Sequence, residues 1–223
     1  MGEQAPDGDR PDRDRTSGDG YLERVLPPGQ QRREHLPVMH YGPVPKVRDR
    51  DAWWIRFWGH TSNEVGAVRD LSLTEAHTLT LGELDTLPRT RVVADLHCGQ
   101  GWSVLDNVWE GVAAREVIDR FPPAEDVTHV LVYAEYGYSA TIGLEDLASP
   151  RTLLATHLDG RELTPEHGHP VRLVVPHLYS WKGPKWFRGW EYLTSPRRGF
   201  WEERGYHLHG ECWNQERYSY QEP

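Results

Sequence analysis

The segment VVADLHCGQGW, residues 92–102, places a cysteine at the end of an apolar run and follows it with two glycines. Alternate side chains share a face of a strand, so Cys98 belongs to the apolar face and His97 to the opposite one. A cysteine in this place can be a metal ligand, a nucleophile or a small buried hydrophobe. Because the two side chains point apart, they are a poor fit for a paired thiolate and base, and a cysteine hydrolase is disfavoured.

Three cations occur close together in this acidic chain. Arg172, Lys182 and Lys185 fall within one short segment. Gly183 and Pro184 separate the two lysines and let the backbone curve towards a ligand there. Arginine offers a planar fork for phosphate and lysine a mobile point charge, so the segment predicts a phosphate-binding cradle. Solvent-exposed strand ends are the alternative interpretation.

A second group of candidate metal ligands lies near the C-terminus. His207, His209, Glu211 and Cys212 have side-chain types that bind zinc. Their close spacing is crowded for a tetrahedral site, and no second pair of Cys or His completes a zinc pattern. Aromatic packing and surface histidines are therefore preferred over a structural zinc site built on Cys212 with His207 or His209.

The overall charge limits the partners that the chain can attract. Its 223 residues carry a formal net charge of −9, so neither nucleic acid nor an anionic membrane is expected as a partner. Two cysteines are too few for a disulfide framework and fit a reducing compartment. Arg32 and Arg33 lack the apolar stretch that follows them in an export signal, and no run is long enough to span a membrane. We expect a cytoplasmic protein.

Composition also divides the chain into a tail and one domain. Residues 1–20 are almost free of apolar side chains and cannot bury enough surface to offset the entropy of ordering, so we expect a disordered tail there. Residues 21–223 show no internal repeat and are expected to form a single domain. Their short apolar runs are rich in Val, Tyr and Trp, which favours strands over long helices. The predicted fold class is α+β, mixed and mostly β, with short helices.

The spacing of apolar residues predicts where the individual strands and helices lie. A near-continuous apolar run at 127–135 is typical of a central strand, and residues 112–121 have one apolar helical stripe that two prolines end. Asp159 and Gly160 predict a two-residue hairpin turn. Further strands are predicted at 52–59, 91–98 and 169–176, and a short helix is predicted within 79–88, where Pro88 ends it.

Four motifs together resemble a known family. PVMHYGPVP, ADLHCGQGWSVLDNVWEGV, HGHPVRLVVPHLYSWKGPKW and GFWEERGYH, in this order and spacing, are similar to the sulfite oxidase-like family of molybdopterin-dependent oxidoreductases. The resemblance covers residues 36–218. It implies a mixed, mostly β fold that holds one molybdenum ion through a pterin dithiolene and one protein cysteine.

The resemblance places Cys98 as the protein ligand to molybdenum. A soft thiolate suits a metal that is already bound by sulfur, and the thiol loses its proton on binding. Gly99 and Gly101 are then expected to leave space beside the metal. The residues expected to line the metal site and the entrance of the substrate pocket are Trp102, Trp109 and Tyr138.

By the same comparison, further residues are expected to hold the cofactor. Arg172, Lys182, Gly183, Pro184 and Lys185 are the implied phosphate contacts. The implied pterin contacts are His40, Tyr41 and His167, and His97 is either a residue behind Cys98 that supports the cofactor site or only a strand-end histidine.

The chain also departs from the family's pattern, and the departures bear on the substrate. Gly99 and Gln100 follow the cysteine, residues 134–138 read AEYGY, and no arginine lies just after Cys98 to hold an anion. The missing arginine argues against sulfite itself, and the expected substrate classes are a sulfite-like anion and an S-oxide or N-oxide. The length leaves no room for a haem domain, so a separate electron-transfer protein is expected. The expected function is oxygen-atom transfer to or from a small substrate, and the alternative is a non-catalytic carrier of the molybdenum pterin.

Overall fold

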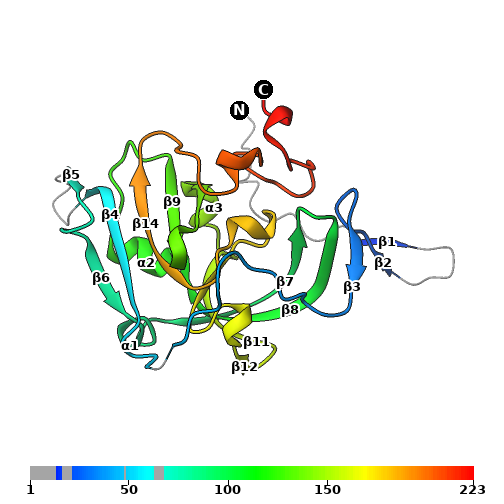
Figure 1. Ribbon diagram of the computed structural model, residues 1–223, viewed down its shortest axis with the longest axis horizontal. Helices are drawn as coiled ribbons and strands as arrows, with labels where there is room; N and C mark the ends of the chain where they lie inside the picture. Colours follow the sequence, from blue (N-terminus) through cyan, green and yellow to red (C-terminus); the bar gives the residue numbers. More distant parts are fainter. Residues whose placement is uncertain (1–13, 17–21, 48, 63–67) are drawn as a thin grey trace, which may run out of the picture.

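The computed structural model describes residues 14–16, 22–47, 49–62 and 68–223 (Figure 1). The predicted disordered tail, residues 1–20, lies outside these residues except for strand β1, Asp14–Thr16, which pairs with β2, Leu22–Arg24. The other strands form two mixed six-stranded sheets joined by short helices, which confirms the predicted mostly β class. In the described part of the chain, no helix has the length and apolar character of a membrane span.

The first sheet contains the strand predicted at 127–135. Its order is β10-β9-β14-β4-β5, and β6 also pairs with β4. The β14–β4 pair is parallel and the other pairs are antiparallel. The strands are β4 Trp54–Ser62, β5 Val68–Leu71, β6 His77–Thr80, β9 His129–Ala134, β10 Ser139–Gly143 and β14 Phe187–Leu193.

The second sheet is built around β8, which pairs with β3, β7 and β11. β12 and β13 both pair with β11, and only the β3–β8 pair is parallel among these described strands. Residues 102–113 were not predicted to form a strand. Pairing with three other strands determines the conformation of β8 more than local alternation of side chains does. The strands are β3 Gln31–Arg33, β7 Arg89–Cys98, β8 Trp102–Ala113, β11 Leu153–Leu158, β12 Arg161–Glu162 and β13 Arg172–Val174.

The helices are short, as predicted. Thr80 and Glu83 form a capping box at the start of α1, and α2 buries the predicted apolar stripe but begins two residues later than the pattern suggested, because β8 continues to Ala113. The α-helices are α1 Leu81–Leu84, α2 Ala114–Arg120 and α3 Leu144–Leu147. The 3₁₀ turns are η1 Glu135–Gly137, η2 Pro165–His167, η3 Ser180–Lys182, η4 Glu202–Arg204 and η5 Ser219–Gln221.

The main core joins the two sheets. Ile55 and Phe57 of β4 belong to one buried cluster with Leu173 of β13. A smaller cluster on the second sheet contains Cys98 and Val174, so neighbouring residues of β13 serve different cores. This arrangement confirms the alternation predicted for both β7 and β13. It also leaves the side of β13 that carries Arg172 free to contribute to a pocket.

The connections bring distant segments together beside the second sheet. Between β11 and β12, Asp159 and Gly160 have φ of 52° and 75°, which confirms the predicted two-residue turn. The chain between β3 and β4 crosses from the second sheet to the first, and the C-terminal segment after β14 returns beside β7 and β8 (Figure 1). Both segments supply walls of the pocket described next.

Candidate active site

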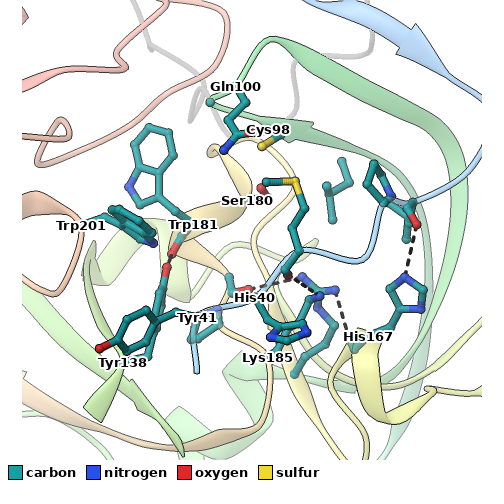
Figure 2. Close-up of a pocket in the computed structure, with 18 of the residues that line it drawn as sticks. His40, Tyr41, Cys98, Gln100, Tyr138, His167, Ser180, Trp181, Lys185 and Trp201 are labelled. Carbon is teal, nitrogen blue, oxygen red and sulfur yellow. Dashed lines mark hydrogen bonds between the residues drawn. The ribbon is translucent and has the colours of Figure 1, made fainter. Parts of the chain in front are cut away.

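A cavity of about 200 Å³ lies against the second sheet. Figure 2 shows Cys98 and Gln100 at one end of this pocket and Lys185 and His167 at the other. The lining residues are Leu36, Pro37, Met39, His40, Tyr41, Leu96, Cys98, Gly99, Gln100, Trp102, Glu135, Tyr138, His167, Arg172, Ser180, Trp181, Gly183, Pro184, Lys185, Trp186, Trp201 and Tyr206. One thiol and a pair of cations therefore mark opposite ends of one elongated site.

Cys98 is placed by the tight connection between β7 and β8. It is the last residue of β7 and pairs with Trp102, the first residue of β8. A Cβ on Gly99 would lie 2.6 Å from the ring of Trp181, and Gly101 has φ of +88°, which favours glycine. The Trp181 indole therefore occupies the space where a side chain at position 99 would lie, while Gly99 itself still lines the cavity.

The Cys98 sulfur lies in surroundings that can support a thiolate. The side chain is 9% exposed, and this burial raises the pKa of the thiol. Hydrogen bonds from the Gln100 backbone amide and the Ser180 hydroxyl act in the opposite direction, and so does the more distant Arg33. The free thiol thus keeps its proton, while donors already point at the sulfur for the state in which a metal displaces that proton.

Arg172 is a buried cation without a carboxylate partner among the described residues. It is 4% exposed, and its guanidinium lies 5.1 Å from the ring centroid of Trp109. Its terminal nitrogens make only long bonds to the carbonyls of His167 and Gly183, at 3.3 and 3.4 Å, and its Nε has no partner. Burial lowers the pKa of Arg172 to about 10, a direct sign that its charge is poorly compensated.

Lys185 adds a second cation at the same end of the pocket. Its Nζ donates to the carbonyls of Met39 and Glu166, at 2.7 and 2.6 Å. Burial, and after it the charge of Arg172, lower the pKa of Lys185 to about 7. His167 borders this end too, and burial lowers the pKa of its ring, which favours a neutral imidazole.

Most of the residues expected to hold the cofactor or shape the substrate mouth do line the pocket. Figure 2 shows His40, Tyr41 and Tyr138 around the same space as Cys98. The Tyr138 hydroxyl donates to the carbonyl of Trp181 at 2.6 Å, which fixes the ring in the wall. The expected residues that the structure brings together are His40, Tyr41, Cys98, Trp102, Tyr138, His167, Arg172, Gly183, Pro184 and Lys185.

Lys182 is a correction to the expected phosphate cradle. Its side chain is 0% exposed and lies outside the pocket lining. The ammonium is 2.5 Å from Glu202 Oε1 and donates to the carbonyls of Thr141, at 2.7 Å, and Leu208. All three of its protons are used inside the protein, so Lys182 ties η3 to the C-terminal segment instead of binding phosphate.

Two other expected site residues lie behind the pocket wall. Trp109 is fully buried and supports Arg172 from beneath, so it does not wall the metal. His97 is 3% exposed and its Nδ1 lies 2.7 Å from the Ser103 hydroxyl, on the far side of β7 from the pocket. Of the two expected roles, this geometry favours a supporting residue behind Cys98 over a strand-end histidine without a role.

The C-terminal histidines and Cys212 do not form a metal centre. Among the described residues, no group of three or more His, Cys, Asp or Glu side chains is arranged to hold a metal. The Cys212 thiol donates to the carbonyl of His177, and His207 Nδ1 accepts from the amides of His209 and Gly210. These contacts favour the preferred reading of structural packing over zinc.

Several pocket residues were not singled out from the sequence. Ser180 touches the Cys98 sulfur, and Trp181 packs on Gly99, yet neither has a motif of its own. A clue was available in the unusual tryptophan content, ten residues, of which four line this pocket. The missed lining residues are Leu36, Pro37, Met39, Leu96, Glu135, Ser180, Trp181, Trp186, Trp201 and Tyr206.

These residues fit a cofactor that has a soft metal at one end and an anionic group at the other. A cysteine sulfur with two hydrogen-bond donors suits a soft metal. At the other end, the orphaned Nε of Arg172 and the adjacent Lys185 present positive charge, and neither side chain forms an ion pair with a described carboxylate. A phosphate would satisfy both cations through charge-assisted bonds.

The mostly β fold, and the pocket with a thiol at one end and two cations at the other, are compatible with a domain that binds a metal-pterin cofactor. Residues 41–201 match the family model described as "Oxidoreductase molybdopterin binding domain". The chain belongs to this family, and it is an enzyme of the sulfite oxidase-like type whose cofactor is molybdenum-molybdopterin.

Individual relatives agree with this assignment. The "Uncharacterized oxidoreductase YuiH" of Bacillus subtilis is 35% identical over 87% of this chain and 92% of its own length. The "Putative protein-methionine-sulfoxide reductase subunit YedZ1" of Azospira oryzae is 28% identical over 78% of this chain and 63% of its own length. The crystal structure of the sulfane dehydrogenase SoxCD from Paracoccus pantotrophus shares the fold, with a TM-score of 0.60 at 15% identity, over 87% of this chain and 56% of that chain.

Proposed function

We propose that this enzyme removes an oxygen atom from a small neutral S-oxide or N-oxide, with Cys98 as the protein ligand to molybdenum. The observation that supports this most strongly is the neutral, aromatic end of the pocket around the cysteine. The cofactor, when bound, supplies the two-electron chemistry and the acceptor for the oxygen atom. The chain's own residues bind the cofactor, orient it and limit what reaches it.

In the proposed role as metal ligand, Cys98 changes from a thiol to a thiolate. Its thiol releases one proton when it binds the metal, and the donors from Gln100 and Ser180 then stabilise the sulfur's negative charge. The Trp181 ring packs on Gly99 and so restricts the conformation of the turn beside the sulfur. These groups act before any substrate arrives.

Substrate preference follows from the charges near Cys98. Trp102, Trp181 and Tyr206 line the pocket together with Cys98. Of the charged lining residues, Arg172 and Lys185 are assigned to the phosphate, and Glu135 pairs with Arg188. An oxyanion such as sulfite would be desolvated here without a lining cation to pair with, since Arg33, whose charge acts on Cys98, does not line the pocket, and such desolvation is costly. A neutral sulfoxide avoids that cost, and the name of the Azospira relative, a putative protein-methionine-sulfoxide reductase subunit, supports the sulfoxide class.

The test of this proposal is the protein purified from a host that makes molybdopterin. We expect near-stoichiometric molybdenum and pterin, and we expect dithionite-reduced protein to be reoxidised by dimethyl sulfoxide or methionine sulfoxide. Oxidation of sulfite with a dye acceptor should be much slower. Efficient sulfite oxidation with no response to sulfoxides would reverse the proposed substrate class, and cofactor that neither reductant nor oxide changes would favour the carrier.

The electron donor and the cellular location are also proposals. Electrons reach the enzyme from a separate redox protein, a view that the word "subunit" in the name of the Azospira relative supports. A cytoplasmic location stays a prediction from the sequence.

The Arg172→Met variant is expected to bind molybdopterin about 10- to 150-fold more weakly, because a charge-assisted hydrogen bond is worth about 1.5 to 3 kcal/mol. The measurement is a fluorescence titration of cofactor-free protein, which uses the tryptophans of the pocket. Arg50→Met is the control, since Arg50 pairs with Asp85 away from the pocket. Equal affinities for wild type and Arg172→Met would contradict the phosphate role.

The lowered pKa of Lys185 predicts that the affinity of the cofactor-free protein for molybdopterin depends on pH. Its pKa near 7 means that it is charged below pH 7 and neutral above it in the cofactor-free protein, while a bound phosphate favours the charged form. Affinity should therefore fall as pH rises from 7 to 9, by at most about tenfold per unit, since one proton must be taken up. The phosphate itself is already a dianion in this range. Titrations of Lys185→Met should lack this slope, and a slope that persists would assign it to another group.

A further inference from the structure

We infer that Gln30, Ser103 and His97 form a hydrogen-bonded positioning chain that fixes Cys98 in the orientation needed to bind the metal. This inference rests on the proposed role of Cys98 as the molybdenum ligand. None of the three residues lines the pocket, so their effect on the metal would act through the cysteine backbone.

The contacts form a continuous path. Gln30 Nε2 donates to the carbonyl oxygen of Cys98 at 3.0 Å. The Ser103 hydroxyl donates to Gln30 Oε1 at 3.1 Å. At the far end, His97 Nδ1 lies 2.7 Å from the same hydroxyl oxygen.

The proton count gives this path a direction. A serine hydroxyl has one proton, and that of Ser103 is donated to Gln30. His97 must therefore carry a proton on Nδ1 and donate it to Ser103, which sets its tautomer. The amide of Gln30 is set in the same way, since its oxygen faces Ser103 and its nitrogen faces Cys98. Each group has one orientation that satisfies its neighbour.

The positioning chain connects three strands at the point where the cysteine leaves the sheet. Gln30 directly precedes β3, His97 lies on β7 and Ser103 lies on β8. The Gln31 amide also donates to the carbonyl of Gly101 at 2.9 Å, within the turn that follows Cys98. The β3 end is thus attached to this turn by both side-chain and backbone bonds.

The Cys98 carbonyl receives two donors, one from Gln30 and one from the Gly101 amide at 3.0 Å. Together they fix the peptide after Cys98 and, with it, the direction of its Cα–Cβ bond. Ser103 is 0% exposed and His97 is 3% exposed, so water does not compete for the inner bonds. A ligand held in this way is oriented before the metal binds, which is how outer partners tune metal sites in general.

The test compares holoenzymes with and without the central hydroxyl. Ser103→Ala breaks the path, Ser103→Thr keeps a hydroxyl, and Gln30→Leu breaks the path at a half-buried residue near the surface. Thr152→Ala is the matched control, because it removes a fully buried hydroxyl that donates to the Asp146 carbonyl at 2.7 Å, away from the pocket. The readouts are the visible absorption band of cysteine sulfur on molybdenum, the metal–sulfur distances from X-ray absorption, and kcat.

We expect Ser103→Ala and Gln30→Leu to shift the absorption band, to change the metal–sulfur distances and to lower kcat by about 10- to 100-fold, the usual effect of losing an outer partner of a metal ligand. Ser103→Thr should restore the wild-type spectrum, and Thr152→Ala should leave it unchanged. Spectra of both path-breaking variants that superimpose on wild type would overturn the inference. If the wild type lacks a Cys98-dependent band altogether, the proposed function fails instead, so the two failures are distinct.

Discussion

Cys98→Ser is expected to lower turnover by more than about 100-fold, which is the upper end of the effect of losing an outer partner of a metal ligand. A hydroxyl is a harder and less acidic ligand than a thiol, so it bonds poorly to a metal that already has sulfur ligands. The side chain is otherwise nearly isosteric, and the Cys98 site is 9% exposed, so packing changes little. The loss should therefore appear in the metal's chemistry and not in the fold.

The measurement combines three properties of the same preparation: kcat for a sulfoxide, molybdenum and pterin content, and the visible spectrum. We expect the pterin content to be retained in part, because Arg172 and Lys185 still hold the phosphate, while the sulfur-to-metal absorption disappears. Cys212→Ser is the matched control. Cys212 is 0% exposed, but it lies outside the pocket and donates to a carbonyl as serine can. Unchanged turnover in Cys98→Ser, or an equal loss in Cys212→Ser, would remove the ligand assignment.

The positions that the sequence predicted correctly are those where one local rule is sufficient. Alternation along β7 places Cys98 with the apolar residues of one core cluster. The same rule on β13 separates Arg172 from Leu173, which belongs to the main core. Arg172 lies on the opposite face from Leu173, where it is 4% exposed and lines the pocket. The face of β13 that carries Arg172 was thus predictable from the sequence pattern, and its contact with a phosphate stays a prediction.

The positions that it missed depend on partners far along the chain. Lys182 and Lys185 are three residues apart with the same chemistry, yet one pairs with Glu202 and the other faces the pocket. The 3₁₀ turn η3 and the Gly183–Pro184 bend rotate the backbone between them, and no local pattern states which lysine turns inwards. Gln30 contacts Cys98 across 68 residues, a relation that only the assembled sheet creates. Pairing of this kind is decided by tertiary structure.

Lys182→Met is expected to lower the free energy of unfolding by about 3 to 5 kcal/mol, the usual effect of removing one partner of a buried ion pair. Both side chains of the Lys182–Glu202 pair are 0% exposed. Burial lowers the pKa of the Lys182 ammonium, and the neighbouring carboxylate opposes that effect. Without the lysine, Glu202 would keep only the bond from the Thr141 amide at 3.2 Å, since its Oε2 has no partner among the described residues.

Urea unfolding followed by circular dichroism, at matched molybdenum content, measures this change. Lys185→Met, three positions further on, is the matched control. It removes a cation that no described carboxylate pairs with, so its unfolding free energy should change by less than about 1 kcal/mol while its cofactor affinity falls. The double variant Lys182→Met with Glu202→Leu should recover most of the lost stability, because no charge then remains buried.

The two lysines should therefore separate stability from cofactor binding. If Lys182→Met weakens molybdopterin binding without reducing stability, the phosphate cradle includes Lys182 after all, and the buried pair is not the structural tie that its geometry indicates. If Lys185→Met destabilises the protein more than Lys182→Met does, Lys185 is chiefly a link between Met39 and Glu166. A loss of stability in Lys182→Met and a loss of cofactor affinity in Lys185→Met would establish that these two lysines of one motif have different roles.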